Sequence, residues 1–336
     1  MCGIAGIFST SSEIASLDVI AGSMAGLLRH RGPDSDGVWG SECGRIAFAH
    51  QRLSILDVSD LGRQPMLSPD GRFCVVVNGE IYNYAALKRE LKSLGRNFTS
   101  TSDSEVVLAA IERWGFAEAL QRFVGMFAIA CWDSHDRTLF AARDRIGEKP
   151  FYFTISEKLF AFGSELRCFS KIPGFYPTLD TRSIELFHRL GYIPTPRSIY
   201  SEVHKLEPGT YIKINSKGGV LCSEHFKYWE LLDSLKLERR ISNDLLSRAD
   251  ATEALEALLS DIVRQQMSAD VSLGAFLSGG IDSSLIAALM QAESKARVKT
   301  FSVGFEDEKF NEAGHASNIA KYLGTCLLYT SPSPRD

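Results

Sequence analysis

The sequence predicts an α+β domain of layered, largely antiparallel sheets, followed by an α/β domain with a doubly wound parallel sheet. In the first half, short strand patterns follow one another with few helices between them, which favours antiparallel neighbours joined by tight turns. In the second half, apolar strand patterns alternate with helical ones in the order β-α-β-α, which is typical of parallel strands. A chain of 336 residues is long enough for two such domains.

The composition restricts the kinds of partner and site. The net charge of −4 gives no reason to expect nucleic acid or a membrane surface as a partner. No stretch approaches the roughly 18 apolar residues of a membrane span, and no signal-peptide pattern is present, so we expect a cytoplasmic protein. The seven cysteines are scattered singly and the histidines lack paired ligand spacing. We therefore expect no metal site formed by the protein and no prosthetic group.

The chain begins Met1-Cys2-Gly3, and removal of Met1 would leave one residue with both a thiol and a free α-amine. The thiolate is the attacking form of cysteine, and a neutral α-amine is a competent base within reach of its own side chain. Nucleophile and base would then belong to Cys2 alone. The alternative is an ordinary buried strand that contains a cysteine, and these first residues by themselves do not separate the two.

Apolar residues at helical spacing predict a helix from Leu17 to Leu28, ended by Gly32-Pro33. Short apolar runs at 37–40 and 46–49 predict strands. Arg52 follows the second run, and a guanidinium there can hold a substrate carboxylate through two parallel hydrogen bonds. On the pattern alone, a surface arginine is the favoured interpretation.

The apolar strand at 73–77 leads into Asn78-Gly79-Glu80. An asparagine amide beside a glycine N–H can form an oxyanion hole for attack on an amide. The alternative is a turn from the strand into a helix over 82–94, and both can hold together.

Residues 101–105 precede a further helix, predicted over 106–114. A Ser or Asp in this position is by default an N-cap. Asp103 could instead bind a substrate ammonium, although the spacing favours the cap. Short strands are predicted at 125–132, 138–142, 151–154 and 159–162. The charged stretch 143–150 between two of them is either a solvated loop or a domain contact.

These motifs resemble, in family order, the class II glutamine amidotransferase domain of the asparagine synthetases. The resemblance implies an N-terminal-nucleophile hydrolase fold over residues 1–214, with two largely antiparallel sheets between helical layers. The motifs that carry it are Cys2-Gly3-Ile4, Arg29-His30-Arg31-Gly32-Pro33-Asp34, Arg52-Leu53-Ser54-Ile55, Asn78-Gly79-Glu80-Ile81-Tyr82-Asn83 and Ser102-Asp103-Ser104-Glu105.

The resemblance also implies a role for each matching residue. Cys2 is the nucleophile and its amine is the base, while Asn78 and Gly79 form the oxyanion hole. Arg52 holds the glutamine carboxylate, and Glu80 and Asp103 surround the ammonium. The whole glutamine pocket would comprise Arg52, Leu53, Ser54, Ile55, Leu56, Asn78, Gly79, Glu80 and Asp103.

A shift to polar and charged composition predicts a linker over 215–250, ahead of a second domain over 251–325. A helix is expected over 251–267, a strand over 271–277, and a further helix from Leu285. Between the last two lies a turn with two glycines. Backbone N–H groups in such a turn form a nest for phosphate, although on the pattern alone a turn that binds nothing is an equal alternative.

This turn resembles the pyrophosphate-binding loop of the ATP pyrophosphatases, which cleave ATP to AMP and pyrophosphate. The resemblance implies ATP with Mg²⁺ as a substrate, with backbone contacts from Leu277 and Val303 lining the adenine pocket. The loop residues that match are Ser278, Gly279, Gly280, Asp282, Ser283 and Ser284. A strand at 298–305 and a helix at 311–323 continue the second domain.

The second half departs from the family pattern after this point. A further Ser-Gly nucleotide loop, acidic residues around the acyl-adenylate and a catalytic lysine are not found. Residues 326–336 match neither the preceding helix nor the family's continuation, and we expect them not to be native sequence. We also expect the apolar faces of 273–277 and 298–303 to lack partners, which would leave this half unstable or prone to aggregation.

Taken together, the resemblance implies glutamine-dependent asparagine synthesis. Glutamine would be hydrolysed at Cys2, and the ammonia would amidate aspartate activated by ATP as β-aspartyl-AMP; the chain as given would perform only the first step. Alternatives are another carboxylate acceptor, such as a sugar acid, and a non-catalytic glutamine- or nucleotide-sensing module. A sensor would not need the nucleophile. The oligomeric state stays open, with a homodimer as one candidate.

Overall fold

The computed structural model describes all residues except 12–15, 236–246, 306, 308, 310 and 331–336. The chain divides into two compact units, Met1–Ile241 and Ser242–Asp336, which are described separately. None of the described helices combines the length and the apolar character needed to cross a membrane.

The described part of the first unit contains two antiparallel sheets of six strands each. The first has the order β10-β8-β9-β1-β3-β2, and the second has the order β12-β11-β7-β6-β5-β4. The strands of the first sheet are β1 (Gly3–Ser9), β2 (Ser35–Gly40), β3 (Ile46–Arg52), β8 (Tyr152–Ile155), β9 (Leu159–Gly163) and β10 (His204–Lys205). Those of the second are β4 (Met66–Leu67), β5 (Phe73–Ile81), β6 (Gly125–Asp133), β7 (Thr138–Arg143), β11 (Thr210–Lys217) and β12 (Val220–Lys227).

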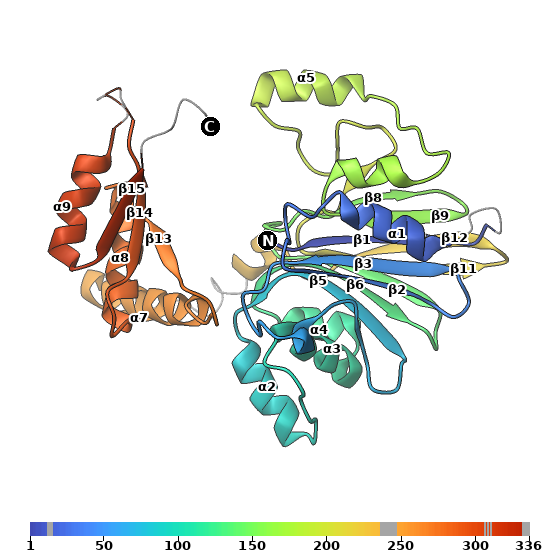
Figure 1. The fold of residues 1–336 in the computed structure, drawn as a ribbon, viewed down its shortest axis with the longest axis horizontal. Helices are drawn as coiled ribbons and strands as arrows, with labels where there is room; N and C mark the ends of the chain where they lie inside the picture. The colour runs from blue at the N-terminus through green and yellow to red at the C-terminus, as the bar shows by residue number, and fades with distance from the viewer. Residues whose placement is uncertain (12–15, 236–246, 306, 308, 310, 331–336) are drawn as a thin grey trace. The chain divides into compact units, whose positions relative to one another are not determined.

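Helices cover the outer faces of both sheets (Figure 1). Helix α1 (Leu17–Gly26) packs on the first sheet, and α2 (Tyr84–Ser93), α3 (Asp103–Trp114) and α4 (Phe116–Arg122) pack on the second. A third apolar cluster fills the space between the sheets. This confirms the expected order of two sheets between helical layers. A further helix, α5 (Thr181–Leu190), lies in the chain between β9 and β10 of the first sheet.

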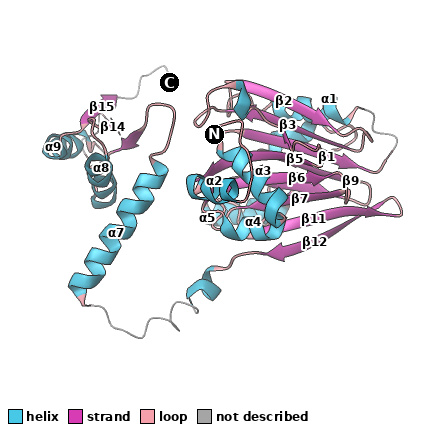
Figure 2. Ribbon diagram, turned by 90° about the horizontal axis from the view of Figure 1, so that it is seen from below, coloured by secondary structure: helices cyan, strands magenta, loops and turns pink. Residues whose placement is uncertain are grey.

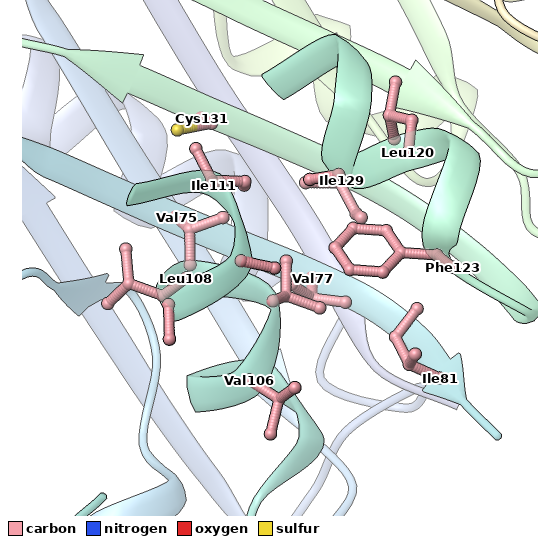
Figure 3. Close-up of a cluster of buried hydrophobic side chains, with 14 of the residues drawn as sticks. Val75, Val77, Ile81, Val106, Leu108, Ile111, Leu120, Phe123, Ile129 and Cys131 are labelled. Atoms are coloured by element: carbon pink, nitrogen blue, oxygen red, sulfur yellow. The ribbon is translucent and has the colours of Figure 1, made fainter. Parts of the chain in front are cut away.

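Strand β5 is apolar on both faces because each face is buried. Val75 and Val77 pack against the helices of the second layer (Figure 3), whereas Cys74 and Val76 pack into the core between the sheets. Since side chains alternate along a strand, Asn78 and Glu80 continue the face of β5 that points between the sheets. The strand thus directs polar side chains toward the start of β1.

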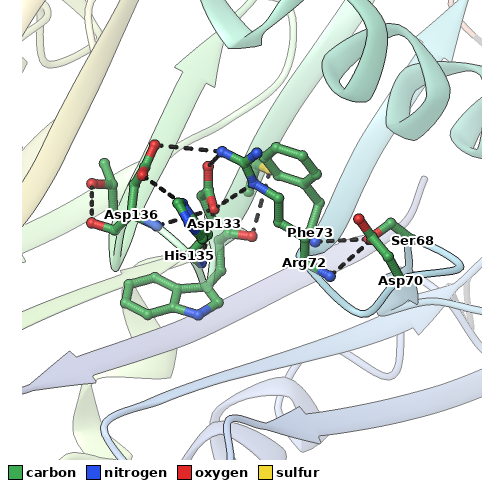
Figure 4. Close-up of polar contacts among 10 residues, drawn as sticks. Ser68, Asp70, Arg72, Phe73, Asp133, His135 and Asp136 are labelled. Carbon is green, nitrogen blue, oxygen red and sulfur yellow. Dashed lines mark hydrogen bonds and ion pairs between the residues drawn. The ribbon is translucent and has the colours of Figure 1, made fainter.

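An ion pair between the half-exposed Arg72, just before β5, and the buried Asp133 fastens that end of β5 to β6 (Figure 4). Arg72 donates two hydrogen bonds to Asp133, from Nε to Oδ1 at 3.0 Å and from Nη2 to Oδ2 at 2.7 Å. Burial would raise the pKa of Asp133, but its hydrogen bonds to Arg72 outweigh this and hold the pKa below the ordinary value. The two carboxylate oxygens match the guanidinium fork, so the pair fixes the alignment of the strands.

The second unit contains a parallel sheet, β13 (Gly274–Phe276), β14 (Lys299–Val303) and β15 (Cys326–Thr330), in chain order. Helices α8 (Ile281–Glu293) and α9 (Ala313–Leu323) connect these strands, and α7 (Arg248–Gln266) precedes them (Figure 2). The predicted β-α-β-α order is therefore confirmed. Among the described strands of this sheet the spatial order follows the chain order, so they do not include the reversal of strand order that marks a doubly wound sheet.

The predicted linker at 215–250 is wrong for its first part. β11 runs past Ile214 to Lys217 and pairs with β12 as a hairpin at the edge of the second sheet (Figure 2). Gly218 and Gly219 form the turn with φ values of 61° and 85°. β12 is mostly exposed and therefore polar, which gives it the composition of a linker. Residues 236–246 lie outside the described part.

That residues 326–336 are not native sequence stays a prediction, but residues 326–330 do pack with the preceding residues in the structure. These form β15, which pairs in parallel with β14 from Lys299↔Cys326 onward; residues 331–336 lie outside the described part. On one face of this sheet Phe276, Phe301 and Leu328 lie side by side in register, with 82%, 38% and 47% of their surface exposed. This apolar row agrees with the expected exposed sheet face.

Candidate active site

A pocket of about 290 Å³ lies where the N-terminus meets the ends of β3 and β5. It brings together the sequence-predicted residues of the glutamine pocket with the exception of Ser54, whose N–H donates to Oδ2 of Asp34 at 2.7 Å. The lining residues are Met1, Cys2, Arg52, Leu53, Ile55, Leu56, Gly62, Gln64, Val77, Asn78, Gly79, Glu80, Ser102, Asp103, Ser104, Met126 and Lys149.

The thiol of Cys2 is placed by strand pairing. β1 pairs antiparallel with β3 so that Gly3 lies opposite Gln51, and the preceding residue therefore reaches the end of β3. There Sγ accepts a hydrogen bond from the Leu53 N–H at 3.4 Å and lies 3.6 Å from the Leu53 carbonyl oxygen. Burial raises the pKa of the thiol, so a base is needed to generate the thiolate near neutral pH.

Asn78 and Gly79 lie inside β5, opposite Ala128 and Phe127 of β6, so they do not form the alternative turn. Asn78 is fully buried, yet neither Oδ1 nor Nδ2 of its amide has a hydrogen-bond partner among the described residues. Leaving a buried amide unpaired is costly, and here the amide lines the pocket. Gly79 is required because a Cβ would lie 2.1 Å from the Met126 carbonyl oxygen.

Two residues that the sequence analysis missed hold the backbone just before Asn78. Gln64 accepts from the Val77 N–H at 2.6 Å and donates to the Val77 carbonyl at 3.3 Å, while Nε2 of His50 lies 3.1 Å from the same carbonyl. Burial lowers the pKa of His50 to about 4, so its ring is neutral at physiological pH. Because a carbonyl only accepts, Nε2 carries the proton. Neither residue belongs to a motif that could have revealed it.

Two carboxylates face the pocket, Glu80 from β5 and Asp103 from the start of α3. The N-cap of α3 is Ser102, whose side chain accepts from the Ser104 N–H, so the spacing-based prediction that Asp103 caps the helix is wrong. Its Oδ2 instead accepts from the Ile81 N–H at 2.9 Å.

Burial raises the pKa of both carboxylates, that of Asp103 to about 6. The hydrogen bond from Ile81 opposes this rise, and the charge of Glu80 adds to it. A pocket with two buried carboxylates favours a cationic group such as an ammonium.

Arg52 is only 6% exposed, so the surface position favoured by the pattern is wrong. Its Nη1 donates to the Ser59 carbonyl at 2.8 Å, and its Nη2 donates to the carbonyls of Leu56 and Asp57. A Cβ on Gly62 would overlap Nη2, so this glycine makes room for the guanidinium. Arg52 therefore shapes the loop that forms one wall of the pocket.

Two further basic residues belong to the site, although the sequence analysis gave them no role. Arg31, which lies in a quoted motif, donates from Nε to the Cys2 carbonyl at 3.0 Å and from Nη1 to Glu165 at 3.3 Å. Lys149 comes from the charged stretch 143–150 and is buried in the pocket wall. The high charge of that stretch was the only feature of the sequence that could have pointed to Lys149.

In the second unit, the Gly-Gly loop links β13 to α8. Its hydroxyl groups bond within the loop: Ser278 Oγ lies 2.9 Å from Ser283 Oγ, and Ser284 donates to the Gly280 carbonyl at 2.6 Å. Gly279 has a φ of 91°, which favours glycine.

The remaining sequence-predicted residues of this loop region differ in exposure. Leu277 is buried and its N–H donates to the Phe301 carbonyl at 2.8 Å. Val303 ends β14 and is 47% exposed. Asp282 is exposed in the first turn of α8. No group of three metal-ligating side chains gathers anywhere in the described residues.

Relatives with similar sequences are named as asparagine synthetases. The chain is 34% identical over 338 residues to asparagine synthetase [glutamine-hydrolyzing] 1 of Bacillus subtilis, covering 100% of this chain and 51% of that protein. It is 37% identical over 312 residues to a putative asparagine synthetase [glutamine-hydrolyzing] of Mycobacterium tuberculosis, covering 89% and 46%. The chain therefore spans about half the length of these relatives.

Two solved structures share the fold. The glutamine phosphoribosylpyrophosphate amidotransferase of B. subtilis, complexed with ADP and GMP, has a TM-score of 0.50 at 16% identity, covering 99% of this chain and 69% of that chain. A structure described as the allosteric regulatory enzyme of purine biosynthesis has a TM-score of 0.52 at 15% identity, covering 99% and 81%. The expected N-terminal-nucleophile hydrolase sandwich is thus confirmed as the fold of the first unit.

Family models match both units. The model described as asparagine synthase matches residues 254–332. The model described as glutamine amidotransferase domain matches residues 1–229, which agrees with a first unit that continues beyond 214. Because this second match covers well over half of the chain, the protein belongs to the glutamine amidotransferase family.

Proposed function

We propose that the first unit hydrolyses glutamine to glutamate and ammonia, with the thiol of Cys2 as nucleophile. The observation that carries this proposal is the unpaired, fully buried amide of Asn78, which lines the same pocket as the thiol. Such a group suits an oxygen that becomes negative only during a reaction.

In the proposed reaction, the Cys2 thiol gives its proton to the α-amine of the same residue, and the sulfur bonds to the amide carbon of glutamine. The carbonyl oxygen takes the negative charge and accepts hydrogen bonds from Asn78 Nδ2 and the Gly79 N–H. The carbon–nitrogen bond then breaks, and the nitrogen leaves as ammonia with the proton returned by the amine. Water hydrolyses the thioester, which releases glutamate and restores the thiol.

The remaining residues would bind the substrate or hold the site. Arg52 would bind the carboxylate of glutamine, and Glu80 and Asp103 its ammonium, which their buried negative charges suit. Arg31 would fix the backbone of Cys2 through its bond to the carbonyl. The α-amine becomes available only when Met1 is removed.

The second unit would use the ammonia to amidate aspartate activated by ATP as β-aspartyl-AMP. The N-terminus of α8 and the hydroxyls of Ser278 and Ser284 suit pyrophosphate, with Leu277 and Val303 near the adenine. Asp282 adds a carboxylate oxygen, a ligand that Mg²⁺ brought with the nucleotide prefers. The names of these relatives, asparagine synthetases, favour aspartate as acceptor over a sugar acid.

Replacement of Cys2 tests the glutaminase function. In Cys2→Ala, glutamate release from glutamine should fall below detection while glutamine binding, measured by calorimetry, survives. Cys43→Ala is the matched control, because this exposed thiol does not line the pocket. Turnover retained in Cys2→Ala, or Met1 found by mass spectrometry on the active protein, would contradict the mechanism.

Pyrophosphate binding tests the assignment of the loop in the second unit. Ser278→Ala should weaken binding by about tenfold, since a hydrogen bond to a charged group contributes about 1.5–3 kcal/mol. Ser294→Ala, at the other end of α8, should leave binding unchanged. Equal affinities in the two variants would count against a role for the loop.

A further inference from the structure

The charged stretch 143–150 is a rigid loop built around a buried carboxylate. Asp144 is fully buried, and its Oδ2 accepts from the Lys149 N–H at 2.9 Å. From the other side, Arg143 donates to the carbonyls of Gly147 and Lys149, each at 2.7 Å. The backbone of Lys149 is therefore held at both its N–H and its carbonyl. The stretch is therefore not a wholly solvated loop: Ile146 and Glu148 are exposed, whereas Asp144 and Lys149 are buried.

This loop delivers the side chain of Lys149 into the pocket that contains Cys2. Lys149 is only 5% exposed, and lysine is almost never this deeply buried unless it is paired. Among the described residues its ammonium has no ion pair within 4 Å. Burial lowers the pKa of Lys149, and the charges of Glu80 and Glu148 oppose that shift. Keeping a cation here costs free energy, which suggests a use for it within the pocket.

Lys149 lines the same pocket as Met1 and Cys2, so its charge acts on the N-terminus and on the thiol. Burial lowers the pKa of the chain's terminal amine, and the charges of Lys149 and Arg31 lower it further. Lys149 also interacts with the thiol of Cys2. Met1, Cys2 and Lys149 line one pocket, and along the chain the α-nitrogen of Cys2 lies between the Met1 amine and the Cys2 thiol. The other charged groups around this point are Glu80 on β5, Asp103 on α3, Arg52 at the end of β3 and Glu148 on the same loop.

We propose that Lys149 sets the lower pH limit of glutamine hydrolysis. Its ammonium favours the thiolate of Cys2 over the thiol, and it disfavours a second positive charge on the adjoining α-amine, which therefore stays in the neutral form that accepts a proton. Lys149 acts through these two groups as a positioning residue. This inference rests on the proposed glutaminase function.

The pH dependence of kcat/KM for glutamine hydrolysis separates this role from a purely structural one. Lys149→Met keeps the length and the apolar stem but removes the charge, and its acidic limb should move to higher pH by about one unit, a shift worth about tenfold at pH 6. Lys149→Arg keeps the charge and should keep the wild-type profile. Lys92→Met, which removes an exposed lysine at the end of α2, is the matched control.

A second measurement does not depend on turnover. Alkylation of Cys2 by iodoacetamide, followed peptide by peptide by mass spectrometry, should show a higher midpoint pH in Lys149→Met than in the wild type. If this variant does not fold, Lys149→Gln takes its place in both measurements. An unchanged alkylation profile, or a rate lowered equally at every pH, would overturn the proposal.

The two proposals fail in different ways. Absence of glutamine turnover in the wild-type protein with Met1 removed would overturn the glutaminase function itself. Turnover in the wild type together with an unshifted acidic limb in Lys149→Met would overturn only the role of Lys149.

Discussion

Asn78 combines complete burial with an amide that has no hydrogen-bond partner in the described structure. Burying an unpaired polar group costs about 1–3 kcal/mol, so this residue weakens the fold. A leucine, which has the same branching and the same number of side-chain heavy atoms, would remove that cost. At this position, stability favours an apolar side chain, whereas the proposed reaction requires the amide.

Replacing Asn78 by leucine should move stability and activity in opposite directions. We expect the free energy of unfolding to rise by about 1 kcal/mol, because the unpaired amide is gone. We expect kcat for glutamine hydrolysis to fall by about 100-fold or more, because an oxyanion donor is lost. Urea denaturation and steady-state kinetics measure the two effects. A variant that loses stability as well as activity would show that the amide has a structural partner instead.

Asp103 should make glutamine binding depend on pH. Its folded pKa of about 6 is above the ordinary value of 3.8, so the ionised form is disfavoured by folding. This group therefore stabilises the protein below about pH 4, and that stabilisation is lost as the pH rises through 6. In Asp103→Asn the difference in unfolding free energy between pH 4 and pH 7 should shrink.

The same variant should raise KM for glutamine by about tenfold at pH 7.5, since a charged hydrogen bond to the substrate ammonium is lost. The ratio of the variant KM to the wild-type KM should approach one below pH 6, where the wild-type carboxylate is protonated. Kinetics from pH 5 to pH 8.5 measure this ratio. A ratio independent of pH would mean that the charge of Asp103 does not contact the substrate.

At the scale of single elements, β5 links the core to the site. Its odd-numbered residues pack on the helices and its even-numbered residues face the other sheet, up to the point where Asn78 replaces an apolar side chain. On this edge of β5, β4 pairs only with Cys74 and Val75. Beyond that point the side chain of Gln64 takes over the role of a strand partner, because it hydrogen-bonds both the N–H and the carbonyl of Val77. One side chain thus holds the backbone that carries the proposed oxyanion hole.

Gln64→Ala should therefore lower both stability and kcat. The buried Val77 N–H would lose its acceptor, which costs about 1–3 kcal/mol. The rate should fall by about tenfold as Asn78 and Gly79 lose their fixed positions, with little change in KM. Gln121→Ala, on the exposed face of α4, is the control for both measurements. Unchanged kcat in a destabilised Gln64→Ala would restrict Gln64 to a structural role.

At the scale of the whole molecule, the pocket and both antiparallel sheets belong to the first unit. Residues 1–241 by themselves should therefore hydrolyse glutamine with a kcat within about twofold of that of the whole chain, as expected for a domain with its own core. Activity assays on the shortened chain, with circular dichroism to check folding, measure this. A folded but inactive first unit would show that the second unit contributes to the pocket.

Local patterns were enough to find most elements. The strands predicted at 125–132, 138–142, 151–154 and 159–162 agree with β6, β7, β8 and β9 within one residue at each end. This works because alternation and turn residues act over a few positions. β12 was missed for the same reason: an exposed edge strand has the composition of a linker.

The order of the motifs along the chain, from Cys2 to the Ser278–Ser284 loop, was readable in the residues themselves, because each motif depends only on its own neighbours. The membership of the pocket could be named only through the family resemblance, because the pocket joins segments far apart in the sequence through the pairing of β1 with β3 and the packing of α3 on β5. Burial follows from that packing. Because of it, Arg52 supports a loop and is not a surface residue, Asp103 accepts a hydrogen bond from β5 and does not cap its helix, and Lys149 lines the pocket that contains the thiol.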